Sequence, residues 1–283
     1  MYTEVGKFLA SYKTGKVPKV FKVVPSLANW EEVLFLTNPD TWTPHATFAA
    51  TRLFVSNLNA SKAQRFNALV LLPKCRDDIF AHKRLNFHLY LALRKATYKP
   101  AAFYKGILLP LAASGDCTLR EALIFGSVIA KASIPQLHSA AAIFKLARDV
   151  PYCGAVSIFL RTLLNKKYAL PYLVIDACAD HFTAFSQEEE TMPVIWHQSL
   201  LALVQRYRGD LTLDQKDRIR TLLSTQHHLG ISPEVRRELA VAGCRGDAPP
   251  VILAKPVGAP RGGFAKRRAI ERGGDTAMEE DEY

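Results

Sequence analysis

Apolar residues recur along most of this chain at the three- and four-residue spacing of amphipathic helices, and the alternation typical of β-strands is rare. Only residues 20–25 and the 250s look strand-like, and prolines interrupt both stretches. Helix starts are marked by prolines in the first turn and by two capping-box patterns, Thr118–Glu121 and Thr212–Gln215. We therefore predict helices over residues 2–13, 26–36, 43–57, 61–72, 76–97, 100–113, 118–131, 135–149, 154–164, 171–185, 193–208, 213–225 and 233–241.

The prolines also indicate a repeating unit. Pro100, Pro135 and Pro171 follow one another at intervals of 35 and 36 residues, about the length of one helical hairpin. Short predicted connections favour antiparallel packing of neighbouring helices. No consensus motif of a known repeat accompanies this spacing. The sequence therefore predicts an all-α fold in the form of an irregular helical-repeat superhelix, an α-solenoid with TPR- or HEAT-like units.

The composition changes after Cys244, where turn-forming and helix-breaking residues become frequent and the chain closes with an acidic run. We predict a helical domain over residues 1–245 and a flexible tail over residues 246–283 that is dispensable for folding. Within the tail, RGGF at 261–264 and KRR at 266–268 could contact RNA or serve nuclear import. A solvating tail with no role of its own is an equal alternative.

Positive charge is concentrated at the N-terminal end of the chain. Residues 1–105 hold 16 basic and 6 acidic residues, a net charge of +10 out of +11 for the whole chain. A metabolic enzyme does not need such a polarised distribution, whereas a protein that docks on nucleic acid by one end does. The charge pattern therefore favours a protein that binds RNA.

The densest basic stretch, residues 62–99, contains only Asp77 and Asp78 as acidic residues. We expect six of its cations to face outward together and to contact RNA phosphates: Lys74, Arg76, Lys83, Arg84, Lys95 and Lys99. The alternatives are a solvated helix face, internal pairing with the two aspartates, or binding to acidic segments of partner proteins. A second basic site lies in the turn at 165–168, where a solvated loop is equally consistent. The candidate RNA-binding residues are Lys74, Arg76, Lys83, Arg84, Lys95, Lys99, Lys105, Lys166 and Lys167.

Aromatic residues lie among these cations and could stack on exposed RNA bases. Helical spacing instead favours core packing for Phe66, Phe87 and Phe103. For Tyr98 and Tyr104, stacking and core packing are about equally favoured.

Enzymatic chemistry has little support in the sequence. There is no P-loop, GxGxxG or GxSxG motif, and the eight histidines are dispersed. The five cysteines occur singly without a CxxC pair, which predicts reduced core thiols and neither disulfides nor a metal site. No run of about twenty uncharged apolar residues is present. We expect an intracellular protein that has no catalytic residues, no cofactor, no metal, no small-molecule substrate and no membrane association.

Several linked segments resemble the bystin family in order and spacing. The resemblance extends from about residue 2 to residue 240, although Asn165 stands where the family commonly has Asp, and the tail matches nothing in the family. The family's charged N-terminal region is absent, so we expect this chain to correspond to the C-terminal domain. The segments include YTEVGKFLASYKTGKVPKVF, QRFNALVLLPKCRDDI, HKRLNFHLYLALRKA, CTLREALI, SIPQLHSAAAIFKLA, SIFLRTLLNKKYALPY and MPVIWHQSLLALVQRY.

The resemblance implies a non-catalytic factor in assembly of the small ribosomal subunit. It implies association with 40S precursors near the forming beak, and a contribution to 18S rRNA maturation. Implied partners are pre-18S rRNA, small-subunit ribosomal proteins and other assembly factors. Implied locations are the nucleus and nucleolus, and the cytoplasm with pre-40S particles. Two alternatives stay open: a protein-scaffold adaptor without direct RNA binding, and, less favoured, an RNA-modifying enzyme.

Overall fold

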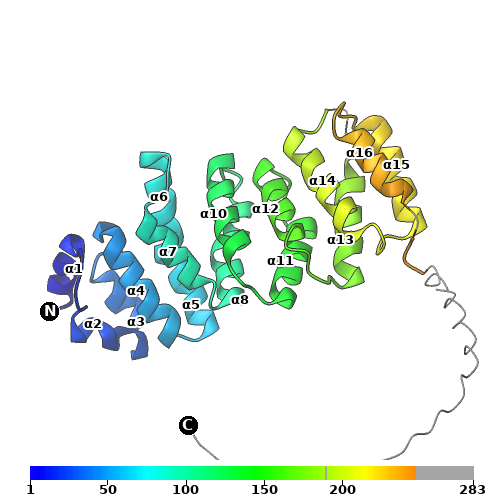
Figure 1. Ribbon diagram of the computed structural model, residues 1–283. Helices are drawn as coiled ribbons and strands as arrows, with labels where there is room; N and C mark the ends of the chain where they lie inside the picture. The colour runs from blue at the N-terminus through cyan, green and yellow to red at the C-terminus, as the bar shows by residue number, and fades with distance from the viewer. Residues whose placement is uncertain (189, 242, 247–283) are drawn as a thin grey trace, which may run out of the picture. The chain divides into compact units, whose positions relative to one another are not determined.

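The computed structural model describes residues 1–188, 190–241 and 243–246, and none of these residues is in a β-strand. The all-α prediction is therefore confirmed over the described part of the chain (Figure 1). The α-helices are α1 (Tyr2–Ser11), α2 (Lys19–Val23), α3 (Trp30–Phe35), α4 (Pro44–Asn57), α5 (Ala60–Phe66), α6 (Leu72–His82), α7 (Phe87–Ala96), α8 (Pro100–Phe103), α9 (Leu109–Ala113), α10 (Leu119–Lys131), α11 (Gln136–Arg148), α12 (Gly154–Leu164), α13 (Tyr172–Thr183), α14 (Val194–Tyr207), α15 (Leu213–Thr225) and α16 (Ser232–Ala240).

Five short helical turns of 3₁₀ or π type lie between these α-helices. They are the 3₁₀ turns η1 (Val24–Ser26), η2 (Pro39–Thr41) and η5 (Ala184–Gln187) and the π-helical turns η3 (Asn67–Leu71) and η4 (Tyr104–Leu108). Residues 1–247 form one compact unit, whereas the tail predicted over residues 246–283 lies outside the described residues except for Gly246. The boundary between domain and tail stays a prediction.

The helices contact one another mainly in an alternating order. From α10 onward, α10, α12, α14 and α16 pack in sequence, and α11, α13 and α15 pack beside them (Figure 1). In the N-terminal part, α4 packs on α7 and α5 packs on α8. The strongest helix–helix contacts therefore join one helical hairpin to the next.

Side-chain hydrogen bonds also join one hairpin to the next. The Tyr168 hydroxyl donates to the Ile134 carbonyl at 2.6 Å, 34 residues away. The hydroxyls of Tyr104 and Ser139 bond at 2.9 Å across 35 residues. Within the described residues, no side-chain hydrogen bond spans more than the 45 residues between Arg76 and Glu121. The bonds between hairpins thus range from about 30 to 45 residues, and the repeat period stays a prediction.

Two hydrophobic clusters divide the core. The N-terminal cluster is aromatic, with the rings of Phe54 and Phe66 stacked at a centroid distance of 4.7 Å, while the larger cluster extends from Leu71 to Leu239. Phe21 and Val24 belong to the N-terminal cluster, and both are fully buried. Their three-residue spacing places them on the same face of a helix. The strand-like interpretation of residues 20–25 is therefore wrong, because this segment forms α2 and η1.

The single helix predicted over residues 76–97 is also wrong, because the structure divides it into α6 and α7. Lys83 has a left-handed backbone with φ of 56° and ends α6. The Asn86 side chain then caps α7 by accepting a hydrogen bond from the His88 N–H at 2.9 Å. The Asp78 carboxylate accepts the Asn86 N–H at 2.7 Å and so fixes the break from the preceding helix.

The π-helical turns η3 and η4 have the same sequence signature. Each begins one residue after a phenylalanine and ends just before Leu-Pro, as in Phe66–Pro73 and Phe103–Pro110. A proline inside a helix lacks an N–H and crowds the carbonyl four residues earlier, and a wider turn relieves both problems. The spacing of prolines alone did not show this repeated F-x-x-x-[VI]-L-L-P motif.

The turn η3 lies where one core cluster gives way to the other. Val70 belongs to the N-terminal cluster, and the next residue, Leu71, belongs to the larger one. Gly106 in η4 approaches this region so closely that a Cβ there would lie 2.6 Å from the Gln64 carbonyl oxygen. Only glycine therefore permits this packing of η4 against α5.

Candidate nucleic-acid interface

Arg76 is a structural residue in an ion-pair network. Its guanidinium lies 2.9 Å from both the Glu121 and the Asp116 carboxylates, and its side chain is only 28% exposed. The expectation that Arg76 faces outward with the other cations is therefore wrong. Internal pairing was one of the alternatives, but its partners are at the start of α10 and not Asp77 or Asp78. The network joins α6 to α10.

Glu121 also completes the capping box predicted for α10. Its backbone N–H donates to the Thr118 hydroxyl at 3.2 Å, and its carboxylate accepts the Thr118 N–H at 2.8 Å. Burial works to raise the pKa of Glu121, but the hydrogen bonds from Thr118 and Arg76 outweigh it and hold the pKa below its usual value. The carboxylate is thus ionised at neutral pH and is committed to the fold.

Lys99 and Lys166 place their ammonium groups on the carbonyl ends of earlier helices. Lys99 Nζ donates to the carbonyl of Leu58, the residue that follows α4. Lys166 Nζ donates to the carbonyls of Ala132, Ile129 and Ala130 at 2.7, 3.0 and 3.3 Å, at the end of α10. Burial lowers the pKa of both lysines. Both side chains cap helices, which contradicts the expectation that Lys99 faces outward.

The remaining candidates are spread over α6, η4 and two turns. Lys74 donates to the Asp40 carbonyl at 2.6 Å. Lys83 and Arg84 are exposed in the turn between α6 and α7, Lys105 is exposed on η4, and Lys167 is exposed in the turn after α12. Among the aromatics, Phe66, Phe103 and Tyr104 are buried, whereas Phe87 is 66% exposed, so its core prediction is wrong. The predicted residues therefore do not form one cluster.

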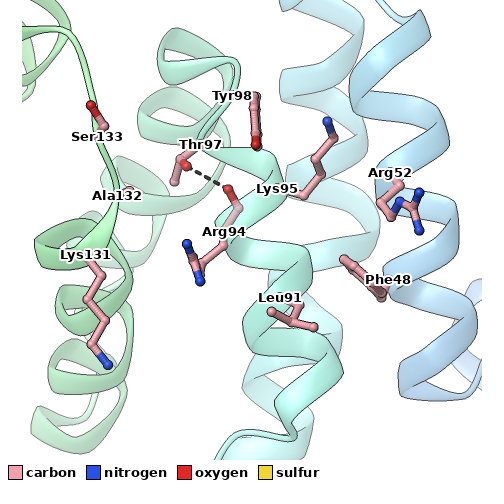
Figure 2. Close-up of a pocket in the computed structure, with 10 residues that line it drawn as sticks. All are labelled: Phe48, Arg52, Leu91, Arg94, Lys95, Thr97, Tyr98, Lys131, Ala132 and Ser133. Atoms are coloured by element: carbon pink, nitrogen blue, oxygen red, sulfur yellow. Dashed lines mark hydrogen bonds between the residues drawn. The ribbon is translucent and has the colours of Figure 1, made fainter. Parts of the chain in front are cut away.

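The structure instead brings a different set of cations together. Figure 2 shows Arg52 from α4, Arg94 and Lys95 from α7, and Lys131 from α10 around a pocket of about 590 Å³. Of these four, only Lys95 was predicted from the sequence. We call this pocket the basic groove. Its lining residues are Phe48, Arg52, Leu91, Arg94, Lys95, Thr97, Tyr98, Lys131, Ala132 and Ser133.

The cations of the basic groove have no carboxylate partners. No Asp or Glu lines the groove, and within the described residues none of its four cations forms an ion pair. Lys95 Nζ lies 4.0 Å from the centre of the Tyr98 ring, and the Arg52 guanidinium lies 5.7 Å from that of Phe48. The positive field of this surface is therefore not cancelled locally, which suits a polyanion.

A second pocket of about 480 Å³ extends this surface toward the N-terminus. It shares Arg52 and Lys95 with the basic groove and adds Lys16 and Lys22, both of which are exposed. It likewise has no Asp or Glu in its lining. Together the two pockets form a band of cations that come from the loop after α1 and from α2, α4, α7 and α10.

Sequence reasoning missed Arg52 and Lys131 because each is an isolated cation in an otherwise neutral stretch. A usable signal exists in their spacing. Arg52, Arg94 and Lys131 follow one another at 42 and 37 residues, close to one helical hairpin. Helices that pack in sequence can therefore collect one cation per hairpin on a single surface.

The thiol, imidazole and carboxylate side chains of the described residues are dispersed. In residues 1–188, 190–241 and 243–246, no three His, Cys, Asp or Glu side chains are grouped so as to hold a metal ion. Cys75 and Cys178 are buried thiols, and burial raises the pKa of Cys178 to about 12. None of the described helices has both the length and the apolar character that a membrane span requires.

Comparison with known proteins gives a family match. A family model described as Bystin matches residues 1–248. Bystin from Nematostella vectensis is 58% identical over 239 residues, which cover 84% of this chain and 55% of that protein. Human Bystin is 57% identical over 242 residues, or 86% of this chain and 55% of the relative, and Bystin from Dictyostelium discoideum is 52% identical over 250 residues, or 88% and 53%. The chain spans about half the length of these relatives, and it belongs to the bystin family.

Proposed function

We propose that this protein is a non-catalytic ribosome biogenesis factor that binds RNA of the small-subunit precursor through the basic groove. The observation that carries the proposal is the set of four cations from three helices that surround one pocket without a carboxylate. The sequence resemblance adds the setting: pre-40S particles near the beak, 18S rRNA maturation, and work in the nucleus, nucleolus and cytoplasm. Ribosomal proteins and other assembly factors would be further partners.

The arrangement of the helices supports a scaffold. Successive hairpins pack on one another and are joined by hydrogen bonds at intervals of about one hairpin, as in an irregular helical-repeat superhelix. Such folds present extended surfaces to several partners at once. The lining of the basic groove contains no His, Cys, Asp or Glu that could serve as a general base or nucleophile. Binding without catalysis is therefore the function that this surface suits.

A salt titration of RNA binding tests the proposal. Each phosphate contact contributes about 0.7–0.9 to the slope of log affinity against log salt, so four groove cations predict a slope near −3. Changing Arg52→Glu and Lys131→Glu together should weaken binding to a pre-18S rRNA fragment and reduce the slope by about 1.5. Both side chains are exposed and form no ion pair with another described residue, so the fold should be retained.

The matched control changes Lys105→Glu and Lys167→Glu, two exposed cations outside the basic groove. It alters the net charge equally and should leave the slope unchanged. Equal losses in both variants would show that RNA responds to net charge and not to the groove. If the wild-type protein has no RNA affinity at physiological salt but still joins pre-40S particles, the protein-only adaptor is correct.

A further inference from the structure

We propose that the basic groove takes an unpaired RNA base, which stacks on the ring of Tyr98 while the surrounding cations hold the flanking phosphates. This inference rests on the proposed function and names the class of RNA that the site prefers. Tyr98 is 75% exposed and lines the groove (Figure 2). Because most of its surface is exposed, the Lys95 ammonium covers only part of the ring and leaves room for a second planar group.

The backbone that carries the exposed Tyr98 ring is held in place by hydrogen bonds. It lies in the short turn between α7 and α8, where its N–H donates to the Lys95 carbonyl at 3.1 Å. The next residue, Lys99, donates from its N–H to the Ala96 carbonyl at 3.2 Å and from its ammonium to the Leu58 carbonyl after α4. Because the backbone that carries the ring is fixed in this way, only the side-chain torsions of Tyr98 lose freedom when a base stacks on the ring. Lys99 is thus a positioning residue for Tyr98.

The chemistry of the groove separates a base from a phosphate alone. Phe48 and Leu91 are half-buried apolar residues in its lining, whereas the charged ends of Arg52, Arg94 and Lys131 belong to exposed side chains. Phosphates need the cations but gain nothing from an apolar wall. An aromatic base with its attached phosphates uses both parts, and a volume of about 590 Å³ is within the usual range of about 300–1,000 Å³ for ligand sites.

Paired RNA cannot make the same contact. In a duplex the bases are stacked inside the helix and the phosphates face outward, so no base is free to reach Tyr98. Single-stranded RNA or a bulged nucleotide presents an aromatic face that any sequence can offer. The groove therefore fits unpaired nucleotides with little dependence on base identity.

A tryptophan reporter tests stacking directly. The three native tryptophans, Trp30, Trp42 and Trp196, are at most 2% exposed, so an indole introduced by Tyr98→Trp would be the solvent-exposed emitter. Titration with a single-stranded RNA of about ten nucleotides should quench this exposed emission. The same RNA annealed to its complement should leave the emission essentially unchanged.

Affinity measurements give the second arm. Tyr98→Ala should weaken binding of the single strand by about 5- to 150-fold without changing the salt slope, and Tyr98→Phe should bind like the wild type. Tyr172→Ala is the matched control, because Tyr172 is also exposed and also lies beside a cation, with the Arg245 guanidinium 4.8 Å from its ring centre, but lies outside the groove. It should leave RNA affinity unchanged. Circular dichroism would check that each variant has the wild-type helix content.

Two results would overturn the inference, and they differ in what else they reject. If the wild type binds single strand and duplex equally and Tyr98→Ala binds as well as the wild type, base stacking is rejected while RNA binding stands. If the wild type binds neither RNA at physiological salt, the proposed function is rejected together with the inference.

Discussion

Replacing Lys166 by methionine tests how the helical hairpins are joined. The end of α10 leaves four backbone carbonyls without a partner inside the helix. The Lys166 ammonium donates hydrogen bonds to three of them. Methionine keeps most of the length and apolar volume of the lysine stem but cannot donate. Lys166→Met therefore removes the cap and changes little else in the packing between α12 and α10.

The magnitude follows from these three contacts. A hydrogen bond from a charged donor stabilises a protein by about 1.5–3 kcal/mol. The contact with Ala130 is long at 3.3 Å, and burial lowers the pKa of the ammonium, so lost hydration offsets part of the gain. We therefore expect Lys166→Met to lower the free energy of unfolding by about 2 kcal/mol. For a domain of this size that corresponds to a decrease in Tm of about 4–8 °C.

Urea denaturation and thermal melting of the purified variants measure the effect. Lys167→Met is the control, because the side chain of Lys167 is exposed and caps no helix; it should shift the free energy by less than about 0.5 kcal/mol. The denaturant slope m should be the same in the wild type and both variants, because neither substitution changes the surface area that unfolding exposes. Equal stability of the two variants would show that the carbonyl contacts of Lys166 contribute nothing and would refute the capping argument.

Two further predictions concern packing and pH. Gly106→Ala should destabilise the protein by about 1–3 kcal/mol in urea denaturation, because its Cβ would lie 2.6 Å from the Gln64 carbonyl oxygen. Gly209→Ala is the control, because a Cβ at Gly209 would meet no other atom within 4 Å, and it should change stability little. Equal effects of the two substitutions would contradict the packing argument. Lowering the pH from 7.5 to 5 should decrease the free energy of unfolding, because burial lowers the pKa of several histidines and the unfolded chain takes up protons below a pKa of about 6.5 that the folded chain does not. A urea midpoint that stays constant or rises over this range would contradict the second prediction. The histidines concerned are His88, His181 and His197.

Local signals predicted most of the helices, and interactions across the fold decided the exceptions. Both capping boxes, at Thr118 and Thr212, are present in the structure, because their hydrogen bonds depend only on neighbouring residues. The break after α6 depends on the Asp78 carboxylate accepting the Asn86 N–H eight residues later. Helical periodicity continues on both sides of this break, so periodicity alone predicts one helix.

The candidate site was predicted less well, because charge density does not show which cations are paired. Arg76 lies in the densest basic stretch, but its carboxylate partner Glu121 is 45 residues away. Arg52 and Lys131 lie outside that stretch, and beside the same groove they form no ion pair within the part of the chain that the structure describes. Only the packing of α4, α7 and α10 brings such distant residues together. Sequence reasoning therefore identified the charged end of the protein but not the arrangement of its cations.

The π-helical turn η3 constrains how this part of the chain can vary in length. Up to Val70 the buried residues of the helix face the N-terminal core, and from Leu71 onward they face the larger one, including Cys75 and Ile79. An α-helix turns by about 100° per residue, so a residue added at the start of α6, between Leu71 and Cys75, would rotate the rest of α6 by that angle. Cys75 and Ile79 would then leave the core that they fill. A one-residue insertion at this point would therefore separate the two cores that one continuous run of helix now joins.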